Sequence, residues 1–221
     1  MVAGEPVRND KELVLSRIRA ALGRTRHAPP TLPAQPEYLV RDEAPREEII
    51  ARFIERAADY RALVQRIAPG SERTAIQEAL ARRGVQKLAI PADLPDEWRP
   101  DGVELLIDGD VPLTYETLDR SDGVLTGCAC AVAQTGTLVL NGGPAQGRRA
   151  LTLLPDYQLC VVLADQIVGL MPEAVRRLAP ADGEHPRPVT FISGPSATSD
   201  IELNRVEGVH GPRTLDILVV G

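Results

Sequence analysis

The chain has 221 residues, of which 43% are hydrophobic and 25% are charged, and its formal net charge is −6. This composition is typical of a soluble globular protein with one sizeable domain and an appendage, or with two small domains. Because Lys and Arg form no dense stripe outside the N-terminal region, the sequence argues against nucleic acid as a main partner, whereas a small anion needs only one local positive pocket.

The cysteine content indicates the cellular compartment and whether a metal cofactor is expected. The chain has three cysteines and no evident secretory signal, which favours a reducing compartment. Cys128 and Cys130 lie in an apolar run, and the three histidines are too scattered to complete a four-ligand metal site with them. No apolar run reaches the roughly 18 residues of a membrane span. We therefore expect a cytoplasmic protein without a membrane span or metal site, in which Cys128, Cys130 and Cys160 are small core residues.

The first predicted element is a helix over residues 9–22, capped by Asn9 or Asp10. Repeated prolines follow between residues 29 and 45, and because proline fixes φ and lacks an amide donor, they predict an extended linker. We therefore expect residues 1–45 to form an N-terminal helical arm with its linker. The apolar face of such an arm is expected to pack on its own domain or on a neighbouring subunit, which makes a homo-oligomer one expected assembly.

The main domain, residues 46–221, begins with two predicted helices. Apolar side chains recur at helical spacing over residues 46–67, and a second helical pattern over residues 71–84 ends at a glycine suited to the C-terminal cap. Residues 85–90 and 102–108 follow as apolar strands. Helices that alternate with strands predict a largely parallel sheet.

The second half of the chain is richer in apolar, strand-like runs. We expect strands over residues 137–140, 151–155, 158–164, 189–194 and 215–220, and short helices over residues 172–178 and 200–208. The whole pattern predicts one α/β domain, with an open, mostly parallel sheet and helices on both faces.

Two stretches near the middle of the chain carry candidate binding groups. In Gln134-Thr135-Gly136-Thr137 the glycine permits close approach of another group and the threonines offer hydroxyls, although a glycine bulge at the start of a strand explains the same residues. The loop that starts at Asn141 ends in Arg148 and Arg149, whose guanidiniums suit carboxylate or phosphate oxygens. The alternative for this loop is a solvated hairpin. Because neighbouring strand residues face opposite ways, at most one of the two arginines should enter a given pocket.

A third stretch is rich in hydroxyls and lies where a predicted strand meets a predicted helix. Free amides at a helix start favour an anion, and capping alone accounts for one of the hydroxyls. The candidate residues are Ser193, Gly194, Ser196, Thr198, Ser199 and Asp200. His210, in a glycine-rich turn before the last strand, could supply a donor or a proton. We hypothesise that these stretches line one small-anion pocket at the ends of neighbouring strands.

Four segments together resemble the LUD-domain family, in its lactate-utilisation protein C group (formerly DUF162). They are AQTGT (residues 133–137), LPDYQLCVVLADQIV (154–168), ISGPSATSDIE (192–202) and GVHGPRTLDILVV, which ends at Val220. The resemblance covers most of residues 50–221. The chain departs from the common pattern at Gln134, where family members often have glutamate, so the resemblance does not extend to a mechanism that needs a carboxylate there, such as acyl-CoA transfer.

The resemblance implies an α/β fold of the NagB/RpiA/CoA-transferase type and a role in oxidising L-lactate to pyruvate. It also implies two partner subunits that carry iron–sulfur clusters. This chain has no evident cluster ligands and no flavin or nicotinamide fingerprint, so we expect it to be a non-redox subunit that binds a small carboxylate. The alternatives are an independent enzyme acting on a small anionic metabolite, similar to a phosphosugar isomerase or a CoA transferase, and a structural scaffold.

Overall fold

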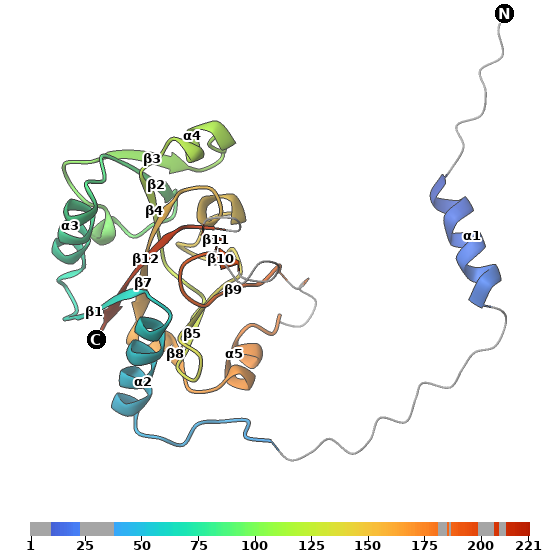
Figure 1. Ribbon diagram of the computed structural model, residues 1–221, viewed down its shortest axis with the longest axis horizontal. Coiled ribbons are helices and arrows are strands. Elements are labelled where there is room, and N and C mark those ends of the chain that lie inside the picture. Colours follow the sequence, from blue (N-terminus) through green and yellow to red (C-terminus); the bar gives the residue numbers. More distant parts are fainter. Residues whose placement is uncertain (1–9, 23–37, 181–184, 186, 199–205, 208–210) are drawn as a thin grey trace, which may run out of the picture. The chain divides into compact units, whose positions relative to one another are not determined.

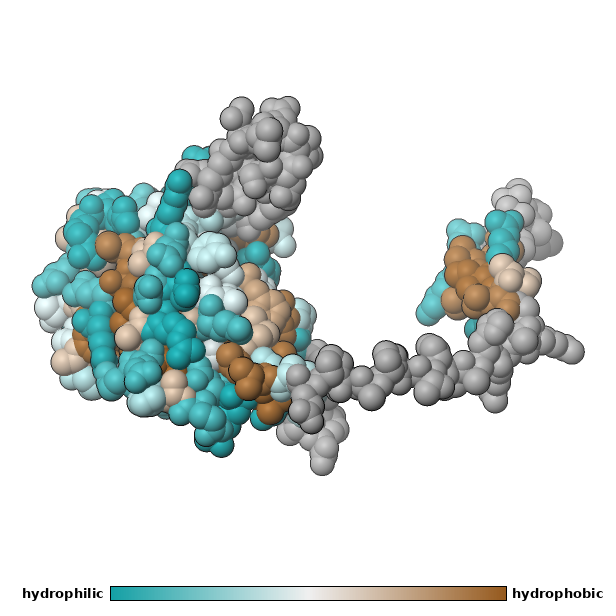
Figure 2. All heavy atoms as spheres, turned by 60° about the horizontal axis from the view of Figure 1, so that its bottom comes forward, coloured by the Kyte–Doolittle hydropathy of each residue, from teal (hydrophilic) through white to brown (hydrophobic). Residues whose placement is uncertain are grey.

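The computed structural model describes residues 10–22, 38–180, 185, 187–198, 206–207 and 211–221. The chain divides into two units, Met1–Tyr38 and Leu39–Gly221, so the last residues of the expected linker are part of the second unit. In the first unit α1 (Asp10–Leu22) has no buried residue. Figure 2 shows apolar side chains gathered on one side of α1, where Leu13, Val14 and Ile18 are exposed.

The second unit contains a six-stranded sheet in the order β1-β12-β7-β4-β2-β3 (Figure 1). Its strands are β1 (Leu63–Ile67), β2 (Lys87–Pro91), β3 (Glu104–Asp108), β4 (Gly123–Thr126), β7 (Tyr157–Leu163) and β12 (Thr214–Val220). Every neighbouring pair is parallel, with Ile217 of β12 opposite Cys160 of β7 and Val64 of β1. The central strands are mostly apolar because both faces of a parallel sheet are covered. The predicted parallel sheet is confirmed.

Helices cover both faces of this sheet, as the sequence predicted. Successive side chains of β7 alternate between two cores, with Leu159 in one and Val162 in the other. In the first core α3 (Glu72–Arg83) contributes the buried Ile76. In the second, α2 (Arg46–Asp59) contributes Phe53, whose side chain is fully buried. A smaller core lies under α4 (Tyr115–Asp119).

A second, four-stranded sheet in the order β8-β5-β6-β9 packs on the α2 side. Its strands are β5 (Cys130–Val132), β6 (Thr137–Leu140), β8 (Ile167–Val168) and β9 (Thr190–Ile192). Leu138 faces the core shared with the six-stranded sheet, while Val139 packs beneath α5 (Met171–Arg177). The sequence predicted β6 and a longer β9 but assigned both to a single sheet, because short apolar runs do not reveal which strands pair.

Three predicted elements differ from the structure. The expected helix over residues 46–67 stops at Asp59, because Arg61 adopts a left-handed φ of 69° and the chain turns into β1. The expected strand over residues 151–155 begins as a short 3-10 helix, η2 (Arg149–Thr152). Of the expected helix over residues 200–208, only Val206–Glu207 is described, and it forms strand β11 against β10 (Ala197–Thr198).

None of the helices in the described ranges is long and apolar enough to cross a membrane.

Candidate functional site

The hydroxyl-rich turn does not occupy the position in the sheet that the sequence predicted. Ser193–Ser196 follows β9, which pairs antiparallel with β6 at the edge of the four-stranded sheet. In the described part of the chain the turn leads into β10 and not into a helix. The prediction that the turn lies at the carboxyl end of a parallel strand was therefore wrong, because β9 belongs to the second sheet. The predicted start of the following helix, at residue 200, lies outside the described residues.

The turn does lie beside the threonine-containing stretch, as predicted. Thr135 Oγ1 is 2.7 Å from Thr137 Oγ1, which in turn is 2.8 Å from Ser193 Oγ. Thr137 is buried, and its hydroxyl links β6 to the end of β9. These three hydroxyls are hydrogen-bonded to one another, so they join the two segments of the second sheet.

The two glycines of these stretches allow a helix end to approach closely. Gly136 has φ 62°, and a Cβ at this position would lie 2.4 Å from the Ala57 nitrogen of α2. Gly194 has φ 81°, and its Cβ would lie 2.4 Å from the carbonyl oxygen of Tyr60, which caps the same helix. Gln134 is exposed, and its backbone nitrogen donates to the carbonyl of Gly169. The close approach that the sequence suggested for Gly136 is therefore to α2.

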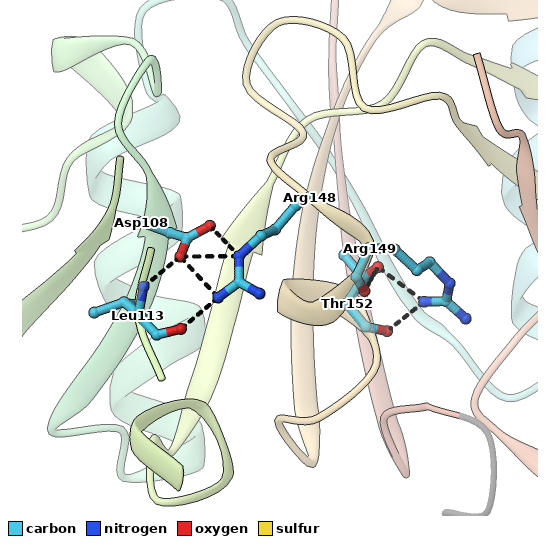
Figure 3. A network of polar contacts seen from close by, with 5 residues as sticks. All are labelled: Asp108, Leu113, Arg148, Arg149 and Thr152. Carbon is cyan, nitrogen blue, oxygen red and sulfur yellow. Dashed lines mark hydrogen bonds and ion pairs between the residues drawn. The ribbon is translucent and has the colours of Figure 1, made fainter. Parts of the chain in front are cut away.

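Arg148 is committed to an internal ion pair (Figure 3). Its Nε lies 2.9 Å from Asp108 Oδ2 and its Nη2 3.1 Å from Oδ1, and Nη2 also donates to the carbonyl of Leu113. The Asp108 side chain, at the end of β3, is only 6% exposed. Arg148 therefore neutralises a buried carboxylate and ties the start of η2 to β3.

Arg149 points away from that ion pair (Figure 3). Its Nη1 donates to the carbonyl oxygen and the hydroxyl of Thr152, at 3.1 and 3.0 Å, and no carboxylate lies within ion-pair distance among the described residues. Partial burial lowers the pKa of the Arg149 guanidinium. The expectation that at most one of the two arginines enters a given pocket holds for the smaller of two adjoining cavities, which Arg149 alone lines, but not for the larger one, which both arginines line. The reason is that Arg149 lies in a 3-10 turn and not in a strand.

Arg149 lines a cavity of about 230 Å³ that we call the Arg149 cavity. Its wall includes Ser193, Gly194 and Ser196 of the predicted turn, and its buried part includes Thr152 and Gln158. The predicted Gln134, Thr135, Gly136 and Thr137 do not line it. The structure thus brings Arg149 together with the hydroxyl-rich turn, while the QTGT stretch supports that turn from behind.

A second cavity of about 350 Å³ adjoins the first, since both are lined by Arg149, Thr152 and Thr190. The glycine-rich loop forms much of its wall, and the loop is held by hydrogen bonds from Asn141 N to Gln146 Oε1 and from Ala145 N to Asp93 Oδ2. The loop is therefore a braced part of the fold and not the solvated hairpin that was one alternative.

Some predicted site residues cannot be compared. Ser199, Asp200 and His210 lie outside the described residues, and the side chain of Thr198 in β10 is not described. Gly211 and Pro212, which come directly after His210, line the Arg149 cavity.

Gln158 lines the cavity, and the sequence reasoning passed over it. It lies within the apolar run of β7, and it is fully buried. The sequence did contain a signal for Gln158, because it is an uncharged polar residue inside a strand whose other residues are apolar. A buried polar side chain requires a hydrogen-bond partner, so its presence in such a strand indicates a specific contact.

The three cysteines are buried and free. A hydrogen bond with Cys160, together with burial, raises the pKa of the Cys128 thiol, and burial raises that of Cys130. These two thiols therefore stay protonated at neutral pH, and a protonated thiol is a poor nucleophile and metal ligand. Within the described ranges no three His, Cys, Asp or Glu side chains converge as a metal site would need.

Comparison with known proteins identifies what this chain is similar to. The model of the LUD domain matches residues 38–220. The "Lactate utilization protein C" of Deinococcus radiodurans is 46% identical over 188 residues, which are 85% of this chain and 87% of that protein. The protein of the same name from Shouchella clausii is 26% identical over 96% of this chain and 97% of its own length.

Among solved structures, the crystal structure of a DUF162 family protein from Deinococcus radiodurans superposes with a TM-score of 0.68. It is 42% identical in sequence and covers 80% of this chain and 99% of its own.

Proposed function

Because this chain belongs to the LUD domain family, we propose that it acts in lactate utilisation and binds a small carboxylate in the Arg149 cavity. The observation that carries the proposal is the Arg149 guanidinium, which lines the cavity without a carboxylate partner among the described residues. The names of the relatives support the lactate-utilisation part of the proposal.

The geometry of Arg149 favours an anion from solution. Thr152 accepts two hydrogen bonds from Arg149 Nη1 and holds the guanidinium in place. Among the described residues no hydrogen bond involves Nε or Nη2 of Arg149. The guanidinium is partly desolvated, and a ligand carboxylate would supply the compensating charge through charge-assisted hydrogen bonds. A volume of about 230 Å³ suits a small metabolite, as it lies below the range of about 300–1,000 Å³ of drug-sized ligand pockets.

We expect Arg149→Ala to weaken carboxylate binding about tenfold or more, because a hydrogen bond to a charged group contributes about 1.5–3 kcal/mol. Arg149→Lys should fall between wild type and alanine, since lysine keeps the charge but loses the planar fork. The measurement is calorimetric titration of the purified chain with L-lactate, and then with pyruvate.

The matched control for this test is Arg120→Ala. Arg120 forms an exposed ion pair with Glu116 on α4, with side chains 76% and 71% exposed, so its loss should leave binding unchanged. If wild type binds no small carboxylate, or if Arg149→Ala binds like wild type, the proposed site is wrong.

We further propose that this chain is a non-redox subunit and that partner subunits hold the iron–sulfur clusters. The lack of three converging His, Cys, Asp or Glu side chains within the described ranges supports this division, because a metal site needs several ligands together. We therefore expect the untagged chain, purified alone, to contain only substoichiometric iron and zinc by mass spectrometry. Iron should appear in stoichiometric amounts when the chain is recovered together with its partners. Stoichiometric metal in the isolated chain would contradict the proposal.

A further inference from the structure

The larger cavity beside the Arg149 cavity offers room that a small carboxylate at Arg149 does not use. Its volume of about 350 Å³ lies within the range of about 300–1,000 Å³ that is typical of ligand pockets. We call it the Arg187 cavity, after an arginine that lines it and does not line the Arg149 cavity. Because Arg149 lines both cavities, a ligand held by Arg149 can extend from one into the other.

Arg187, like Arg149, has no carboxylate partner. Among the described residues it forms neither an ion pair nor a hydrogen bond. A Cβ on Gly143 would lie 3.5 Å from Arg187 Nη1, so the guanidinium rests beside the braced glycine-rich loop that forms much of the cavity wall. Its charge is therefore available to an anion in the cavity.

The two arginines lie toward opposite ends of the Arg187 cavity. Arg149 is shared with the Arg149 cavity, which Arg187 does not line. Arg187 is shared with two further cavities, of about 130 and 290 Å³, which Arg149 does not line and to which Arg177 adds another positive charge. Leu140 and Pro188 contribute apolar wall to the Arg187 cavity. The cavity thus combines two cationic ends with an apolar surface.

The charge that lines this cavity is positive throughout its described part. Arg148 also lines it, but Asp108 neutralises that guanidinium, and no Asp or Glu is among the described residues that line the Arg187 or Arg149 cavity. Arg149 and Arg187 therefore leave two uncompensated charges in a cavity of a chain whose net charge is −6. Such a local positive potential attracts an anion with more charge than one carboxylate supplies.

We propose that the Arg187 cavity binds the second acid group of a ligand whose first carboxylate is bound by Arg149. This rests on the proposed function, in which Arg149 binds a carboxylate. The second acid group is a carboxylate or a phosphate, because a guanidinium fork matches the oxygens of both. A short carbon chain would join the two groups and pack against Leu140 and Pro188. Once the first group is bound, the second binds within the same complex, at a high effective concentration.

The experiment compares dicarboxylates with monocarboxylates of the same chain length by calorimetric titration at low salt. The pairs are succinate with butyrate, glutarate with pentanoate, and adipate with hexanoate, while 3-phosphonopropionate replaces the second carboxylate by a phosphorus acid. Wild type should bind at least one of these dianions about fivefold more tightly than the matching monocarboxylate, because an exposed ion pair contributes up to about 1 kcal/mol. Added salt should reduce this preference, since Arg187 is exposed.

Arg187→Ala should lower the preference for the dianion to less than about twofold, and Arg187→Lys should keep part of it. Arg187 has no partner within the described structure, so circular dichroism should show that both variants fold. Arg120→Ala, which removes an exposed arginine on α4, should leave the preference intact.

Two results would overturn the inference and leave the proposed function standing. One is wild type that binds every dianion no more tightly than its matching monocarboxylate, and the other is an Arg187→Ala variant that keeps the preference. Wild type that binds neither the monocarboxylates nor the dianions overturns the proposed function as well.

Discussion

Arg148→Ala is expected to lower the free energy of unfolding by about 3 kcal/mol, because it leaves a buried carboxylate without its cation. Asp108 is 6% exposed at its side chain, and Arg148 supplies two of its nitrogens to the two carboxylate oxygens. The backbone nitrogen of Leu113 is then the remaining hydrogen-bond donor to the Asp108 carboxylate among the described residues. Urea denaturation followed by circular dichroism measures the loss.

Arg149→Ala is the matched comparison, since the two residues are neighbours in the chain. Arg149 bonds only to Thr152 within the described structure, so its removal should cost less than about 1 kcal/mol of stability, as is usual for an exposed position. Arg148→Lys should lie between Arg148→Ala and wild type, because lysine keeps a charge but cannot form the fork. Equal stability of the Arg148→Ala and Arg149→Ala variants would mean that the two arginines do not divide their roles between fold and ligand.

The sequence predicted the central sheet well because its signals there are local. The apolar runs of β7 and β12 match the observed strands to within a residue or two, and Gly84 ends α3 in the left-handed conformation expected of a capping glycine. The boundary between α2 and β1 was missed because the apolar spacing continues through Tyr60 to Val64. What ends the helix is the left-handed turn at Arg61, which residue periodicity does not reveal.

The candidate site was predicted only in part, because contacts between segments that are distant in the sequence determine which residues line the cavity. The sequence identified the pair of arginines, but the ion pair of Arg148 with Asp108 on β3, which leaves Arg149 without a carboxylate partner among the described residues, depends on a segment distant in the sequence. It also placed the Ser193 turn near Thr137, which the structure confirms, yet it assigned β9 to the wrong sheet. Gln158 was passed over because a single polar residue in an apolar run becomes informative only when its burial in the fold is known.

The two glycine-containing motifs that resemble the LUD family meet at one helix end. A Cβ on Gly136 would contact the backbone of Arg56 and Ala57, and one on Gly194 would contact Tyr60. Thr137 and Ser193, which adjoin these glycines in the chain, are hydrogen-bonded to each other. The C-terminal end of α2 therefore rests against both motifs, and the position of the Ser193 wall of the Arg149 cavity depends on that contact.

Gly136→Ala is accordingly expected to destabilise the domain by about 2–5 kcal/mol. A left-handed conformation costs a non-glycine residue about 1–2 kcal/mol, and inserting an atom into a packed interior costs about 1–3 kcal/mol more. The methyl group would meet backbone atoms at 2.4–2.5 Å, and backbone, unlike a flexible side chain, cannot move aside without shifting α2. Urea denaturation measures the loss, and lactate titration of the folded fraction should show weaker binding as the Ser193 turn shifts.

Gly84→Ala separates the two contributions to this effect. Gly84 has φ 67°, close to the 62° of Gly136, but a Cβ there would meet no atom within 4 Å. Its substitution therefore carries the conformational cost alone, about 1–2 kcal/mol, partly offset by the reduced freedom of the unfolded chain. The excess loss in Gly136→Ala measures the close approach of α2. If both alanine variants lose the same stability, the glycine of the QTGT stretch is required for its backbone conformation and not for the contact with the helix.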